Sequence, residues 1–163
     1  MFSNYVIHKW VLYSVWSEVD PKNSLLITFD ISNVKMRLPH HMDFHIQFTY
    51  QKNTIFQIVV DEGASICIMS LSCWKVIGSH EVIPSPTLLT TFDFHSHRPH
   101  GTLPAFPICV GGKVVNIEFE IVDANLNYNL LLCHNLVYLM DSIVSSLFHI
   151  IFFPHEGRIV TID

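Results

Sequence analysis

The chain has few charged side chains and no run of basic ones. Charged residues make up 14% of its 163 residues, and its formal net charge is -5. Nucleic acids are held largely by lysine and arginine side chains that neutralise phosphates. We therefore expect no direct binding of DNA or RNA.

The sequence also lacks an apolar run long enough to cross a membrane. Its two most apolar stretches, 5–16 and 143–154, are shorter than the roughly 20 residues of a spanning helix. No basic start followed by an apolar core and a small-residue cleavage site marks a secretory signal. We expect no membrane contact and an intracellular, cytoplasmic location.

No two cysteines have the C-x-x-C spacing of a redox or zinc motif. All four lie in apolar runs: Cys67, Cys73, Cys109 and Cys133. This placement is typical of reduced, buried thiols in an intracellular protein.

What the chain does contain is enough apolar residues, 50% of the total, for one hydrophobic core and one domain. From position 43 onward, apolar and polar residues alternate as in half-buried strands. Strands are expected at 44–50, 54–60, 103–110, 114–122, 130–132, 148–153 and 158–162. Those at 103–110 and 114–122 form a hairpin around Gly111 and Gly112, with Glu120 on the polar face of the second. The segment 70–77, between Ser70 and Gly78, is expected to be a short helix, with a strand as the alternative, and 135–141 a helical turn. The pattern predicts a mainly β domain over 43–163, preceded by an N-terminal extension or linker of unknown role over 1–42.

An Asp-x-Gly-Ala turn follows the second of these strands. Asp61 comes directly after an apolar run, and Gly63 permits close backbone approach at the turn. A carboxylate at the end of a strand on such a turn is aimed outward, as a catalytic acid requires. No other Asp in the chain has a Gly two positions later.

The surrounding sequence resembles the protease domain of plant long-terminal-repeat retroelements of the Gypsy type, which are retropepsin-like aspartic proteases. The resemblance runs from about Asp43 to Asp163 through four blocks in the right order. These blocks are 59–65 (VVDEGAS), 103–112 (LPAFPICVGG), 128–132 (YNLLL) and 153–162 (FPHEGRIVTI).

The resemblance implies a retropepsin-like acid-protease β-barrel with one or two short helices, a peptide or polyprotein substrate, and no cofactor or metal. It makes Asp61 the catalytic residue. The other site residues that it implies are the active-site loop Glu62, Gly63, Ala64 and Ser65, the substrate-binding flap Phe92, Asp93, Phe94 and Gly101, and the loop behind the active site Leu131, Leu132 and Cys133.

Catalysis by this class needs two carboxylates about 3 Å apart that share one proton. One chain supplies a single Asp-x-Gly turn, so an active enzyme is expected to be a homodimer with Asp61 of each subunit at the two-fold axis.

The sequence departs from the resembled family at one single position and at one pair of positions. Glu62 stands where Thr, Ser or another small residue is usual, and Cys133 and His134 replace a Gly-Arg pair. Two extra carboxylates beside the catalytic pair disfavour assembly at neutral pH unless they turn to solvent, so activity is expected to favour acid. A side chain at Cys133 is expected to crowd a contact that Gly allows between two backbones.

Two other chemistries have weaker support in the sequence. His95, His97 and His100 cluster closely enough to offer imidazoles to a metal, although a chain with 11 histidines makes such clusters common. Ser65 and Cys67 follow the turn, but neither lies in a nucleophile elbow, and we expect them to support the loop and fill the core.

The sequence thus predicts an aspartic-type endopeptidase domain of a retrotransposon polyprotein, diverged from its family and acting as a homodimer. We also expect the chain to be a piece of a longer polyprotein. The alternative is a non-catalytic protease-fold domain that binds peptides or dimerises.

Overall fold

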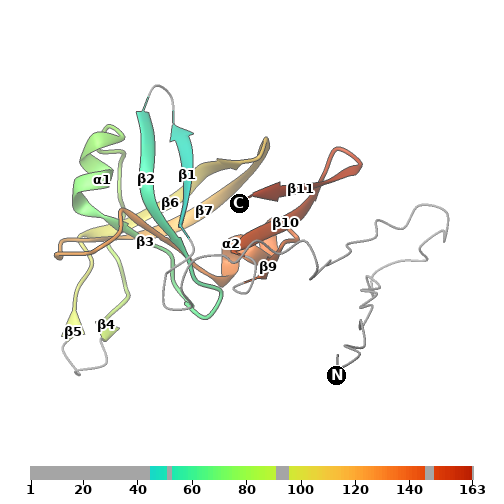
Figure 1. Ribbon diagram of the computed structural model, residues 1–163. Coiled ribbons are helices and arrows are strands. Elements are labelled where there is room, and N and C mark those ends of the chain that lie inside the picture. The colour runs from blue at the N-terminus through green and yellow to red at the C-terminus, as the bar shows by residue number, and fades with distance from the viewer. Residues whose placement is uncertain (1–44, 51–52, 91–95, 146–148, 163) are drawn as a thin grey trace, which may run out of the picture.

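The computed structural model describes residues 45–50, 53–90, 96–145 and 149–162. These residues are mainly β, with two short helices, and form one six-stranded curled sheet, one three-stranded sheet and one two-stranded hairpin (Figure 1). The predicted fold class is confirmed. The predicted extension over 1–42 lies outside the described residues.

The six-stranded sheet begins with an antiparallel pair, β1 (His45–Tyr50) and β2 (Asn53–Val60). Ile46 and Phe48 are buried while Gln47 is exposed, which confirms the alternation read from the sequence. At the other end, β6 (Gly101–Val110) and β7 (Lys113–Val122) form a second antiparallel hairpin around two glycines, also as predicted.

Two short strands close the middle of this sheet. β8 (Leu130–Leu132) pairs in parallel with β2 and antiparallel with β3 (Ile68–Ser70), and β3 pairs in parallel with β7. Because β2 and β8 run in the same direction, their carboxyl ends lie side by side, with Val60 opposite Leu132. The residues that follow these two strands therefore meet at the same end of the sheet.

The first helix, α1 (Leu71–Val76), follows β3 without a loop. The Ser70 hydroxyl oxygen accepts a 3.1 Å hydrogen bond from the Cys73 N–H, which satisfies a donor that the first helical turn leaves unpaired. Gly78, at φ +107°, follows the end of the helix. The predicted helix over 70–77 is confirmed.

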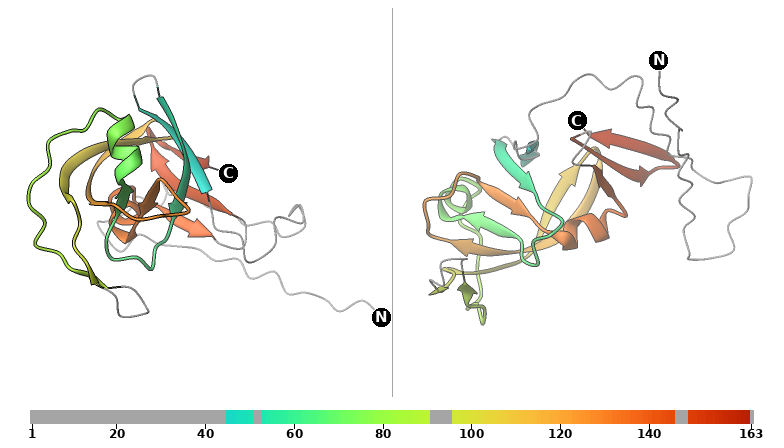
Figure 2. Two further views of the ribbon diagram at one scale, coloured as in Figure 1. Left: turned by 90° about the vertical axis from the view of Figure 1, so that its left-hand side faces the viewer. Right: turned by 60° about the horizontal axis from the view of Figure 1, so that its bottom comes forward.

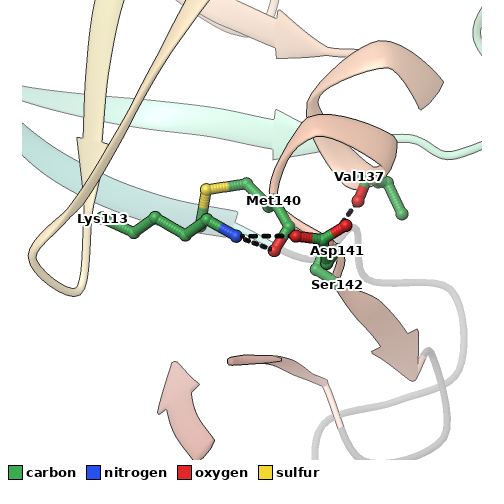
Figure 3. A network of polar contacts seen from close by, with 5 residues as sticks. All are labelled: Lys113, Val137, Met140, Asp141 and Ser142. Atoms are coloured by element: carbon green, nitrogen blue, oxygen red, sulfur yellow. Dashed lines mark hydrogen bonds and ion pairs between the residues drawn. The ribbon is translucent and has the colours of Figure 1, made fainter. Parts of the chain in front are cut away.

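The second helix, α2 (His134–Leu139), is held at its carboxyl end by a lysine from the start of β7 (Figure 3). The Lys113 ammonium donates a 2.6 Å hydrogen bond to the Met140 carbonyl oxygen and lies 3.2 Å from the Asp141 carboxylate. A cation at this position complements the negative end of the helix dipole.

The three-stranded sheet consists of β9 (Ile143–Ser145), β10 (Ile150–His155) and β11 (Arg158–Ile162). It contacts the β6–β7 turn at Gly111, whose φ is +54°. A Cβ at Gly111 would lie 2.7 Å from Val160 and 2.8 Å from Phe153. Only glycine fits this contact.

The hairpin of β4 (Leu89–Thr90) and β5 (Ser96–His97) projects from the body of the sheet (Figures 1 and 2). Its base is fixed by two 2.9 Å backbone hydrogen bonds between Ile83 and Thr102.

Neither described helix has the length and apolar character needed to cross a membrane.

Candidate active site

Asp61 lies at the end of the sheet where the carboxyl ends of β2 and β8 are side by side. Its N–H donates a 2.9 Å hydrogen bond to the Leu132 carbonyl oxygen, which continues the parallel pairing by one residue. Its side chain is exposed. The fold therefore places the predicted catalytic carboxylate where a substrate can reach it.

The Asp-x-Gly-Ala turn is organised around the Asp61 side chain. The Asp61 Oδ1 atom accepts a 2.9 Å hydrogen bond from the Gly63 N–H, and the Asp61 carbonyl oxygen accepts one of 3.2 Å from the Ala64 N–H. A Cβ at Gly63 would lie 3.2 Å from Oδ1, which is tighter than nearly all real contacts of this kind. Any larger residue here would push the carboxylate away from its hydrogen bond by a few tenths of an ångström.

The other loop residues lie in the same turn at this end of the sheet. Glu62 and Ser65 are exposed and Ala64 is half-buried. In the single chain Glu62 and Asp61 are therefore both accessible from solvent.

The segment predicted to lie behind the active site does contact the Asp61 loop. Leu132 is fully buried and Leu131 is half-buried. The His134 N–H donates a 3.0 Å hydrogen bond to the Ala64 carbonyl oxygen. The structure therefore brings 61–64 and 131–134 together.

Cys133 is joined to Cys67 by a disulfide, with 4.8 Å between the two Cα atoms. The expectation of four reduced, buried thiols is wrong for this pair, because β8 and β3 are neighbours and carry the two side chains to one point in the core. Cys133 is accommodated through this bond, and not as a separate thiol wedged between two backbones.

The remaining two cysteines are free thiols. Cys109 is exposed, contrary to the expectation of burial, because it lies on the outer face of β6. Cys73 is buried in α1, and its burial raises the pKa of the thiol to about 11.

Three of the four predicted flap residues, Phe92, Asp93 and Phe94, lie outside the described residues, between β4 and β5. Gly101 is described and is buried at the start of β6. A Cβ at Gly101 would lie 2.9 Å from the Ile83 carbonyl oxygen. Its observed place is therefore the close contact at the base of the hairpin.

The histidines considered for a metal are not brought together in the part of the chain that the structure describes. His95 lies outside it, and the His100 ring packs against Trp74 with 5.2 Å between ring centroids. Among the described residues no group of three His, Cys, Asp or Glu side chains has metal-binding geometry.

Tyr128, which lies in one of the resembling blocks, was not singled out as a site residue. Burial raises the pKa of its phenol above the ordinary value, and the Asp61 carboxylate adds to the shift. The phenol is thus protonated at neutral pH, and the field of the Asp61 carboxylate reaches it.

A buried carboxylate, Glu120, was also missed. Its carboxylate accepts hydrogen bonds from the hydroxyls of Ser85 at 2.9 Å, Thr87 at 2.9 Å and Thr102 at 3.2 Å. These bonds tie the chain before β4 to β7. The alternating pattern of β7 had placed Glu120 on its exposed face, and no local signal reveals the three hydroxyls that receive it.

A cavity of about 130 Å³ lies beside the disulfide. It is lined by Ser65, Ile66, Cys67, Thr87, Glu118, Glu120, Cys133 and Asn135. The cavity therefore borders both the Asp61 loop and the residues that hold the base of the β4–β5 hairpin.

A solved structure has a fold similar to that of this chain. The retroviral protease-like domain of Ddi1 from Leishmania major matches with a TM-score of 0.57 and 11% sequence identity, over 74% of this chain and 94% of that one. No protein-family model matches the sequence, and no curated protein matches it either. The chain has a retropepsin-like fold, mainly β with two short helices among its described residues.

Proposed function

We propose that the chain is an aspartic-type endopeptidase domain in which Asp61 is the catalytic residue. The observation that carries this proposal is the place of Asp61: exposed, directly after β2, and bonded through its N–H to Leu132 in a retropepsin-like fold. The carboxylate is held by its own turn and faces solvent, so it is free to meet a second carboxylate and a water molecule.

The proposed enzyme is a homodimer, because each chain carries one Asp-x-Gly turn. Two such turns related by a two-fold axis would place the two Asp61 carboxylates next to one another. The ionised carboxylate accepts a proton from water, and the water oxygen attacks the scissile carbonyl carbon. The protonated partner donates a hydrogen bond to the carbonyl oxygen, where negative charge develops.

The proposed substrate is a peptide segment of a retroelement polyprotein. This proposal is supported by the four sequence blocks that resemble Gypsy-type proteases, which end in the described β10–β11 hairpin. On the same ground we propose that the protein acts inside the cell and needs neither a membrane nor nucleic acid for cleavage.

A second candidate is a peptide-binding or dimerisation domain without catalysis. It is favoured by Glu62, which is exposed immediately beside Asp61 and would bring two further carboxylates to the two-fold axis. Like-charge repulsion at that axis would weaken the catalytic pair while leaving a peptide cleft in place.

A peptide-cleavage assay with pepstatin, run beside analytical ultracentrifugation, separates the two candidates. The protease is expected to cleave a denatured protein substrate at acid pH, to be inhibited by pepstatin, and to show a specific activity that rises with concentration below the dimer dissociation constant. Peptide binding without cleavage at any pH would support the second candidate.

A further inference from the structure

The disulfide joins two segments that the proposed chemistry also depends on. Cys67 closes the Asp61 loop just before β3, and Cys133 is the residue before α2. The two positions are 66 residues apart in the sequence and their Cα atoms are 4.8 Å apart, within the range that a disulfide spans without backbone movement.

Two hydrogen bonds also join the same two segments. The Cys133 N–H donates to the Cys67 sulfur at 3.0 Å, and the His134 N–H donates to the Ala64 carbonyl oxygen at 3.0 Å. Loss of the disulfide would leave these weaker contacts as the connection between the Asp61 loop and the start of α2.

The disulfide is buried, and it lies beside a cavity. Cys67 and Cys133 are each 2% exposed, but both line the cavity of about 130 Å³ whose other walls include Ser65 and Asn135. A small thiol or dithiol needs only to bring one sulfur atom into this opening to attack the disulfide.

We propose that Cys67 and Cys133 form a redox modification site that controls the rigidity of the Asp61 loop. In the oxidising direction, one protein thiolate attacks a low-molecular-weight disulfide of the glutathione type and releases one thiol. The second protein thiolate then attacks the mixed disulfide and releases the other thiol. Two protein thiols are oxidised, one small disulfide is reduced, and the two cysteine protons leave on the two released thiols.

The two redox states hold the loop differently. In the oxidised state the loop is covalently fixed to the residue before α2. Reduction replaces that bond by a non-bonded contact, so the two sulfur atoms must move apart inside a packed core. This proposal goes beyond the protease function, because the loop is fixed or released whether or not Asp61 cleaves a peptide.

The test uses the full chain carrying Cys109→Ser, which removes the exposed thiol and prevents disulfides between chains. The protein is equilibrated in glutathione buffers from fully reduced to fully oxidised. Peptide mapping without reductant identifies the linked cysteines, and hydrogen–deuterium exchange is followed over 61–67 and 129–136. We expect a Cys67–Cys133 linked peptide in the oxidised buffer, with exchange at least about tenfold slower in both segments. The melting temperature should rise by roughly 10 °C on oxidation.

Two further variants make the result specific. Adding Cys133→Ser should abolish the linked peptide and the difference in exchange, because Cys67 alone can form only a mixed disulfide. Adding Cys73→Ser, which removes a buried thiol outside the pair, should keep both. Should Cys133→Ser fail to fold, the comparison of reduced and oxidised Cys109→Ser protein still decides. Free thiols at Cys67 and Cys133 in the most oxidising buffer, or equal exchange of 61–67 in both states, would overturn the proposal.

Discussion

The N–H of Asp61 donates a 2.9 Å hydrogen bond to the carbonyl oxygen of Leu132, so the candidate catalytic residue is fixed to the end of a strand 71 positions later in the chain. This bond is a consequence of the parallel pairing of β2 with β8. The orientation of Asp61 therefore depends on β8 and on the segment that follows it, and not on the turn alone.

Replacing Asp61 with Asn is expected to abolish cleavage and leave the fold intact. The amide oxygen of Asn can still accept the hydrogen bond from the Gly63 N–H, but the amide cannot take a proton from water. Cleavage and circular dichroism should be measured together. Asp141→Asn is the control, because this exposed carboxylate pairs with Lys113 beyond the end of α2 and should change stability by less than about 1 kcal/mol. Wild-type cleavage by the Asp61 variant would exclude this mechanism.

The hairpins and short helices could be predicted from the sequence because their signals are local. Alternation at Ile46 and Phe48 revealed β1, and the glycines at 111 and 112 marked the β6–β7 turn. The order Ser70 to Gly78 revealed the start and end of α1. In each case residues within about ten positions of one another fix the structure.

The contacts that build the site could not be predicted because they join distant segments. β3 is only three residues long and leads directly into α1, too short to show a period. The Cys67–Cys133 pair depends on β8 lying beside β3, and the hydroxyls around Glu120 come from two other segments. Only the resemblance to a protease family pointed to 61–65 and 131–133 as neighbours.

Gly111→Ala is expected to destabilise the fold by about 2–4 kcal/mol. Its Cβ would strike Val160 and Phe153, which adds overpacking to the strain of a positive φ. Gly157→Ala is a matched control, because Gly157 also has positive φ, +72°, but nothing lies within 4 Å of an added Cβ. That variant should lose only about 1 kcal/mol. Urea unfolding measures both, and equal losses would show that the three-stranded sheet does not pack on the turn.

Glu120→Gln is expected to destabilise the fold by about 1–3 kcal/mol, because an amide has one acceptor oxygen and hydroxyls that now bond the carboxylate would lose their charged partner. Glu118→Gln, on the same strand but exposed, should change stability by less than about 0.5 kcal/mol. Hydrogen exchange at the amides of Ser85 and Thr87 should also become faster in the Glu120 variant. Unchanged exchange there would mean that these hydrogen bonds do not hold the chain before β4.

The raised pKa of Cys73 predicts both slow labelling and a loss of stability in alkali. With a pKa of about 11, the thiol is almost entirely protonated at pH 8, and Cys73 is also buried. Iodoacetamide should therefore label the exposed Cys109 at least about a hundredfold faster than Cys73.

The same raised pKa makes the stability of the fold depend on pH. Because the folded-state pKa of Cys73 exceeds the unfolded value near 9, its contribution to the free energy of unfolding is complete below pH 9 and is lost as the pH rises through 11. Mass spectrometry of timed samples and urea unfolding between pH 8 and 11 test the two effects, and equal labelling rates would contradict the first.

Glu62→Thr is expected to strengthen dimerisation at neutral pH and to raise cleavage. In the proposed dimer two Glu62 carboxylates approach the two Asp61 carboxylates, and protonation relieves their repulsion. The wild-type dimer should therefore form more readily as the pH falls. The Thr variant removes two of the four charges and supplies a hydroxyl, so its dimer dissociation constant should fall by about tenfold at pH 7 and change less with pH.

Sedimentation across pH 4.5 to 7.5 measures the dimer dissociation constant, and a peptide assay over the same range measures cleavage. Glu156→Asn controls for the loss of one negative charge per chain, because Glu156 is exposed in the β10–β11 turn and Asn tolerates its φ of +49°. If the Glu156 variant strengthens the dimer as much as the Glu62 variant does, net charge and not the carboxylates at the two-fold axis limits assembly.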